Sequence, residues 1–194
     1  MIAKIFSILF FLFFLFGCSN SKEFSISEID FSEYKGIIFD ANNVLVEDVS
    51  NKDIEPPYID HLIFNNVKLN MSKWIKARII PNFNNENFIK IIIEKANVKA
   101  FPIDNNNKIE DIFLNKAAIK IEVDIFIIIE IIDTNSEKLA YLDLKAFKSK
   151  DLPENISLNE KDYYIQEMIN DIMRDFDKLA VNKIKEIFYQ YIKI

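Results

Sequence analysis

Residues 117–132 read AAIKIEVDIFIIIEII, and this stretch decides the fold class. Every odd-numbered position in it is apolar, whereas the charged residues all occupy even-numbered positions. Successive side chains of a strand point to opposite sides of a sheet, so the pattern predicts a long strand with one buried face. Three even-numbered positions in its second half are also apolar: Phe126, Ile128 and Ile132. We expect these three either to contact the segment 19–35 or to form a surface for a partner protein.

The flanking sequence predicts further strands. Residues 133–137 are polar and suit a hairpin turn, so residues 139–147 are expected to return as an antiparallel partner strand. Residues 88–101 place Ile89, Ile91 and Ile93 on one face. Residues 37–49 also have strand composition, with Asn42 and Asn43 marking a bulge or a break within them.

Two helices are predicted. Met71, Trp74, Ile75 and Arg78 recur at helical spacing within residues 68–80, and Pro81 is expected to end that helix. The Trp74 ring and the stem of Arg78 would cover apolar surface, and Trp74 is also a candidate partner-binding residue. The second helix is predicted to begin after the sequence SLNE at 157–160, which fits a capping box, and to run to the C-terminus with one apolar face.

The predicted order β-α-β-β-β-α favours an α+β fold. The simplest arrangement is a mainly antiparallel sheet with two helices packed on one face, and residues 36–194 are expected to form this single domain. A helix of about 30 residues spans about 45 Å, whereas a strand of ten residues spans about 33 Å. We therefore expect the long C-terminal helix to overhang the sheet, with its end available to a partner.

The N-terminus has the pattern of a targeting segment. Residues 5–16 form an apolar run that is too short to cross a membrane, which needs about 20 apolar residues. The run leads into Leu15, Phe16, Gly17 and Cys18, and these resemble a bacterial lipoprotein signal, although Phe16 is bulkier than usual. An ordinary cleaved signal or a short membrane anchor with an incidental cysteine is the alternative interpretation.

The lipoprotein resemblance implies three things about the N-terminus. Residues 1–17 would be removed as a signal peptide, Cys18 would be acylated on its thiol and on its new amino group, and residues 18–35 would form a tether that docks an apolar residue or two. Attachment to the membrane would then be covalent, through two or three acyl chains. Ser19, in place of an aspartate, favours the outer membrane over the inner membrane, with the domain facing the periplasm.

Composition argues against most enzymatic and cofactor chemistry. The chain holds one Cys, one His and two Gly, so multi-cysteine metal sites, two-histidine motifs and phosphate-binding glycine loops lack their residues. The net charge of −6 does not suit nucleic acid. We expect no cofactor, no metal and no catalytic residue. The remaining enzymatic hypothesis is a hydrolase that uses His61 with a carboxylate, and the acidic pairs Glu110/Asp111 and Glu122/Asp124 are more simply read as solvated side chains.

Four features together resemble an uncharacterised group of alphaproteobacterial lipoproteins. They are the lipobox that ends at Cys18, the segment EPPYIDHLIF at 55–64, the helix with Trp74 and Arg78, and the Asp-rich terminal helix with Phe176 and Asp177. The order of elements is more loosely similar to the auxiliary lipoproteins of ABC-type lipid transport systems. The uncharacterised group has no established activity, so that resemblance bears on the architecture. The anchor, the missing catalytic residues and the sheet–helix layout favour a non-enzymatic envelope lipoprotein that binds a partner protein, with an auxiliary role in lipid transport as its more specific form. A carrier of lipid or another apolar ligand, held in a groove between sheet and helix, is the alternative.

Overall fold

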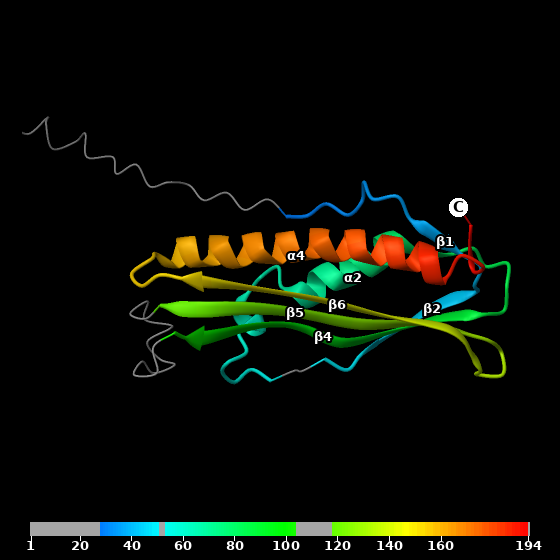
Figure 1. Cartoon of the computed structure of the whole chain (residues 1–194), viewed down its shortest axis with the longest axis horizontal. Helices are drawn as coiled ribbons and strands as arrows, with labels where there is room; N and C mark the ends of the chain where they lie inside the picture. The colour runs from blue at the N-terminus through cyan, green and yellow to red at the C-terminus, as the bar shows by residue number, and fades with distance from the viewer. Residues whose placement is uncertain (1–27, 51–52, 104–117, 194) are drawn as a thin grey trace, which may run out of the picture.

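The computed structural model describes residues 28–50, 53–103 and 118–193. Cys18 and the expected signal peptide therefore lie outside the described residues, as do Glu110 and Asp111. The described chain forms a four-stranded sheet, a three-stranded sheet and two helices that cover one face of the larger sheet (Figure 1). The α+β fold class is confirmed. None of the described helices is both long enough and apolar enough to cross a membrane.

The larger sheet has the order β2-β4-β5-β6. Strands β4 (Phe88–Pro102), β5 (Ile119–Ile132) and β6 (Lys138–Leu152) pair antiparallel, and β2 (Asn43–Asp48) pairs parallel with β4. The predicted alternation in β5 is confirmed, because all its odd-numbered residues are buried. The return strand is longer than the expected 139–147, since residues 148–152 are still paired with β5.

A bulge in β4 keeps one face of that strand buried along its whole length. Ile89, Ile91 and Ile93 are buried as predicted, but beyond Glu94 the buried apolar residues fall on even numbers. The register shifts between Ile93 and Lys95, because one extra residue is inserted opposite the regular β5 strand. The bulge explains why the alternation seen from sequence stops at Ile93: Ala96, Val98 and Ala100 continue the same face in the opposite phase.

The strand region predicted over 37–49 is broken at residues 40–42, which include Asn42, and the chain divides it between two sheets. Strand β1 (Ile37–Phe39) pairs parallel with β3 (Ile79–Pro81) and antiparallel with β7 (Ile192–Lys193), whereas β2 joins the larger sheet. Asp40 holds the crossing point. Its carboxylate accepts hydrogen bonds from the side-chain amides of Asn82 and Asn85, at 2.8 and 3.1 Å, and these bonds lower the pKa of Asp40.

Both helices begin where the sequence indicates. Helix α2 (Val67–Arg78) is capped by Asn66, whose side chain accepts from the Leu69 N–H at 3.0 Å. Helix α4 (Leu158–Ile187) carries the predicted capping box, in which Ser157 and Glu160 each accept from the other's backbone N–H. Figure 1 shows both helices on the same side of the long strands.

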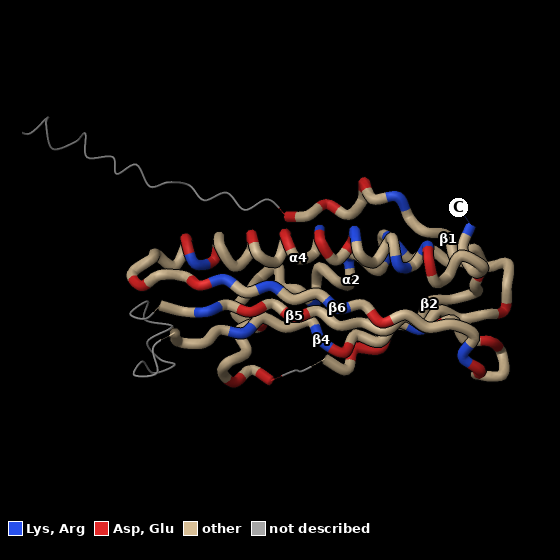
Figure 2. Tube along the Cα trace, in the orientation of Figure 1, with Lys and Arg blue, Asp and Glu red and all other residues tan. Residues whose placement is uncertain are grey.

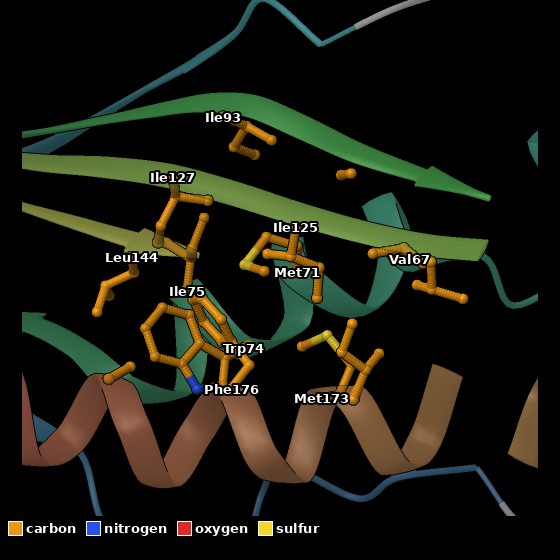
Figure 3. Packing of buried hydrophobic residues seen from close by; sticks show 14 of the residues in the cluster. Val67, Met71, Trp74, Ile75, Ile93, Ile125, Ile127, Leu144, Met173 and Phe176 are labelled. Atoms are coloured by element: carbon orange, nitrogen blue, oxygen red, sulfur yellow. The ribbon is translucent and has the colours of Figure 1, made fainter. Parts of the chain in front are cut away.

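The core lies between the helices and the sheet. In Figure 3, Met71, Trp74 and Ile75 of α2 lie between the strands and α4. Ile125 and Ile127 of β5 complete this contact from the sheet side and have no exposed surface. The N-terminal segment adds to the core as expected, because Ile29 and Phe31 are both buried.

The expected overhang of the last helix is wrong. The 15 residues of β6 span about 50 Å, so the strand is as long as the 30-residue helix. After α4 the chain turns back, with Phe188 fully buried, and its final residues pair with β1 as strand β7. The end of α4 is thereby used inside the domain.

The two faces of β5 should respond differently to truncation. Ile127→Ala removes a fully buried side chain and is expected to lower the free energy of unfolding by about 2–5 kcal/mol. Ile128→Ala, on the half-buried opposite face, is expected to cost less than about 1.5 kcal/mol. Urea denaturation of the two variants measures both losses, and equal losses would contradict the assignment of a single helix-covered face.

Candidate partner-binding surface

The face of the larger sheet that points away from the helices carries an apolar centre. Phe126, Ile128 and Ile132 of β5 lie on it and are half-buried. Across the ladder Ile92 of β4 lies beside Ile128. Strand β6 adds two exposed aromatic side chains that sequence reasoning missed, Tyr141 and Phe147, with exposures of 62% and 61%. The sequence held a signal for them, because both alternate with the apolar residues Leu142, Leu144 and Ala146, of which the two leucines are buried.

Ion pairs lie among these residues on the same face, and Glu130 separates Ile128 from Ile132 along β5. Lys90 of β4 binds Glu47 of β2 at 2.9 Å, and Lys138 of β6 binds Glu130 of β5. Further along, Lys95 binds Asp124 at 3.1 Å. Figure 2 shows basic and acidic positions spread along these strands. Aromatic side chains are enriched at protein–protein interfaces, where charged residues are concentrated at the rim.

A hollow of about 470 Å³ lies next to Phe126. It is lined by Lys95, Asp124 and Phe126 on one side and by Lys145 and Phe147 on the other. The Lys145 ammonium sits 4.4 Å from the centre of the Phe126 ring, which is the geometry of a cation–π contact. The surface is concave at this point, and a side chain of a partner could insert into the hollow.

The described part of the N-terminal segment does not cover this face. Glu28 forms an ion pair with Lys73 of α2 at 3.1 Å, and the Lys35 carbonyl accepts from Arg78 at the end of α2. The segment therefore runs along the helical side of the domain (Figure 1). The expectation that residues 19–35 contact Phe126, Ile128 and Ile132 is thus wrong for residues 28–35, and residues 19–27 lie outside the described residues.

The prediction that Trp74 is a partner-binding residue is wrong, because Trp74 lies inside the domain. The side chain has no exposed surface, so it cannot contact a partner of the folded domain. Its ring packs edge-on against Phe176 of α4, with the ring centres 5.0 Å apart. Its indole N–H donates to the Asp177 carboxylate at 2.8 Å. Trp74 is an anchor between the two helices.

Asp177 brings several of the sequence motifs together. Besides Trp74, it accepts from Arg78 through both carboxylate oxygens, at 2.7 and 2.6 Å. The remaining guanidinium nitrogen of Arg78 donates to the Lys35 carbonyl, and the guanidinium lies 4.7 Å from the centre of the Tyr34 ring. Since the Arg78 and Asp177 side chains are only 12% and 11% exposed, this is a nearly buried, bidentate ion pair.

His61 lies in a short 3₁₀ helix, Asp60–Leu62, that follows the Pro56–Pro57 segment. Its side chain is exposed, and no hydrogen bond to it occurs among the described residues. The neighbouring Asp60 accepts from the Val98 N–H at 2.9 Å, which closes the free edge of β4. Burial raises the pKa of Asp60 against this hydrogen bond, which acts to lower it. This geometry gives the segment a structural role, because Asp60 accepts the hydrogen bond of a β4 backbone N–H that no neighbouring strand accepts.

The described residues offer little else for chemistry. Glu122 and Asp124 both lie on the open face of β5, where Asp124 pairs with Lys95. No three His, Cys, Asp or Glu side chains gather closely enough to hold a metal ion in the described ranges. A cavity between sheet and helix does exist at one end of the layers, lined mostly by apolar residues such as Ile59, Ile121 and Ile165. Its volume of about 190 Å³ is below the roughly 300–1,000 Å³ of typical ligand pockets, so it gives a lipid carrier little room.

No protein-family model matches this sequence, and no curated protein matches it significantly. Several solved structures are similar to it, and two of them are described here. A minor lipoprotein from Acinetobacter baumannii shares 10% identity at a TM-score of 0.37, over 73% of this chain and 92% of that one. A DUF330 protein from Xanthomonas campestris shares 6% identity at a TM-score of 0.35, over 84% of this chain and 93% of that one. At these scores the likenesses carry no argument about family or function.

Removing the Asp177 carboxylate should destabilise the domain strongly. Asp177→Ala leaves the Arg78 guanidinium and the Trp74 N–H without their acceptor in a nearly buried site, so we expect a loss of about 3–5 kcal/mol in unfolding free energy. Asp175→Ala, an exposed acidic position two residues away on the same helix, is the control and should change stability by less than about 0.5 kcal/mol. Chemical denaturation compares them, and similar losses would argue against the contact between the helices.

Proposed function

We propose that this protein is a lipid-anchored lipoprotein of the bacterial cell envelope that binds a partner protein and has no catalytic activity. The observation that carries the proposal is the open face of the larger sheet, where Phe126, Ile128 and Ile132 lie beside ion-paired residues and have no helix over them. Exposed aromatic residues are enriched at protein interfaces, and Tyr141 and Phe147 border this centre.

The anchor is supported by the sequence around Cys18. The only cysteine of the chain follows an apolar run of signal-peptide length and the lipobox-like residues Leu15 and Gly17. Nine residues, 19–27, lie between Cys18 and Glu28, so ten steps of about 3.5 Å from one Cα to the next reach at most about 35 Å. A domain held on such a tether would stay close to the membrane surface, and we propose the periplasmic side of the outer membrane.

The partner class that we propose is a component of an ABC-type lipid transport system. The order of a strand, a Trp-bearing helix, long antiparallel strands and a long terminal helix supports this choice. The identity of a protein captured on the open face would test it directly. An outer-membrane assembly protein or a cell-wall protein in its place would make this a structural lipoprotein and overturn the transport proposal.

Substitution of Cys18 should abolish acylation. In cells supplied with alkyne-palmitate, the natural chain is expected to be labelled and to sediment with outer membranes, because acyl chains hold it there. Cys18→Ser is expected to lose the label and to leave the precursor uncleaved, whereas Ser19→Ala should retain the label. Labelling of the Cys18→Ser variant would contradict the anchor, whatever the outcome for partner binding.

Photo-crosslinking tests the partner-binding surface. Benzoylphenylalanine in place of Tyr141 or Phe147 is expected to capture one consistent envelope protein in native membranes, because both side chains border the apolar centre. The control is Tyr189, an aromatic residue with a matching exposure of 60% after the end of α4, which should capture none. Capture of the same proteins from all three positions, or from none, would contradict a specific surface on the sheet.

A further inference from the structure

A cavity of about 380 Å³ opens beside the small sheet. It is formed where the junction of the N-terminal segment with β1 meets the last residue of α2, the last turns of α4 and strand β7. Its volume falls within the range of pockets that bind small molecules. The cavity lies on the helical side of the domain and shares no lining residue with the open sheet face described above.

Four basic residues line this cavity: Lys35, Arg78, Lys185 and Lys193. No acidic residue occurs among its described lining residues, although the chain as a whole has a net charge of −6. The charge of Arg78 is balanced by its bidentate contact with Asp177. The three lysines are therefore the source of any uncompensated positive charge here.

These three lysines differ from most lysines of the sheet. Lys90, Lys95 and Lys138 on the strands each form an ion pair with a carboxylate. Among the described residues, Lys35, Lys185 and Lys193 form no salt bridge within 4.0 Å. Lys193 does act on the carboxylate of Asp40. The pKa of Asp40 is lowered mainly by its two amide hydrogen bonds, and the charge of Lys193 is the smallest of the causes. Unpaired cations around a concave site raise the local positive potential and attract anions.

The rest of the cavity wall is apolar. Ile38 of β1 is 43% exposed, and Val181 of α4 and Ile192 of β7 are half-buried beside it. A small inorganic anion would leave this apolar wall in water. A ligand that combines an anionic group with an apolar portion would use both parts of the cavity.

The basic side of the cavity is held in place by contacts already described. Arg78 is fixed by Asp177, and its third nitrogen donates to the Lys35 carbonyl at 2.5 Å. Gly36 packs closely at the same point, because a Cβ there would lie 2.7 Å from the Ile80 side chain. The backbone at Lys35 is thus set before any ligand arrives, which lowers the entropy lost on binding.

We propose that this cavity binds the phosphate headgroup of an anionic lipid. Lys35, Lys185 and Lys193 contact the phosphate, and the glycerol and first acyl carbons lie against Ile38, Val181 and Ile192. Charge complementarity selects the headgroup, and the apolar wall distinguishes a lipid from free phosphate. The inference depends neither on the acyl anchor nor on the open sheet face. The lipid site can therefore fail its test while the proposed function passes, and the reverse is also true.

Calorimetric titration of the full chain, kept in a neutral detergent, tests the site. The probes are dihexanoyl phosphatidylglycerol, dihexanoyl phosphatidylcholine and inorganic phosphate. We expect the anionic lipid to bind at least about tenfold more tightly than either other probe. A variant with Lys35→Gln, Lys185→Gln and Lys193→Gln should weaken its binding at least about tenfold.

The control variant loses the same charge elsewhere. Lys76, Lys120 and Lys178 are exposed and form no salt bridge with a described residue, so their exchange for Gln should leave binding within about twofold of the natural chain. Thermal unfolding of both variants verifies that they are folded, and Lys185→Glu alone provides a milder second variant. Equal affinity for the zwitterionic lipid or for inorganic phosphate would overturn the proposal, as would equal weakening in the two triple variants.

Discussion

The contact of Asp177 with Arg78 and Trp74 is the interaction on which the rest of the structure depends. It joins the middle of the long helix α4 to α2, which is otherwise a short helix lying against β4. Through the third nitrogen of Arg78 it also fixes the backbone at Lys35, where the N-terminal segment enters the domain. A nearly buried ion pair is expensive to break on one side, so this contact favours one arrangement of the two helices.

With both helices on one face, the opposite face of the long strands has no covering layer among the described residues. Its composition is mixed, because apolar residues such as Ile128 lie among ion pairs such as Lys90 with Glu47. Such a face is stable in water because the charges solvate its border, yet it retains apolar area that association would bury. The proposed partner surface is thus a consequence of where the helices pack.

The outer strand β6 has the same mixed character. Its lysines on the helical side, Lys148 and Lys150, reach across to Asp171 and Glu167 of α4, so the edge is tied to the helix by ion pairs. Lysines along an exposed edge also discourage pairing with another chain. A partner is therefore expected to approach the face of the sheet and not to extend it by a strand.

By itself, the sequence determined the long alternating strand β5, the strand β6 and the helix α4 that follow it, and the residues at which both helices begin. These elements give the class of fold, and they could be predicted because periodicity and capping are local properties. The sequence also supplied the open-face residues Phe126, Ile128 and Ile132, but not their neighbours Tyr141 and Phe147, which depend on strand pairing. Only the tertiary structure decided that Trp74 is buried, that residues 37–49 divide between two sheets, and that the chain end returns to β1. These outcomes depend on contacts between residues about 40 to 150 positions apart, such as Arg78 with Asp177 and Asp40 with Tyr191, which no local pattern records.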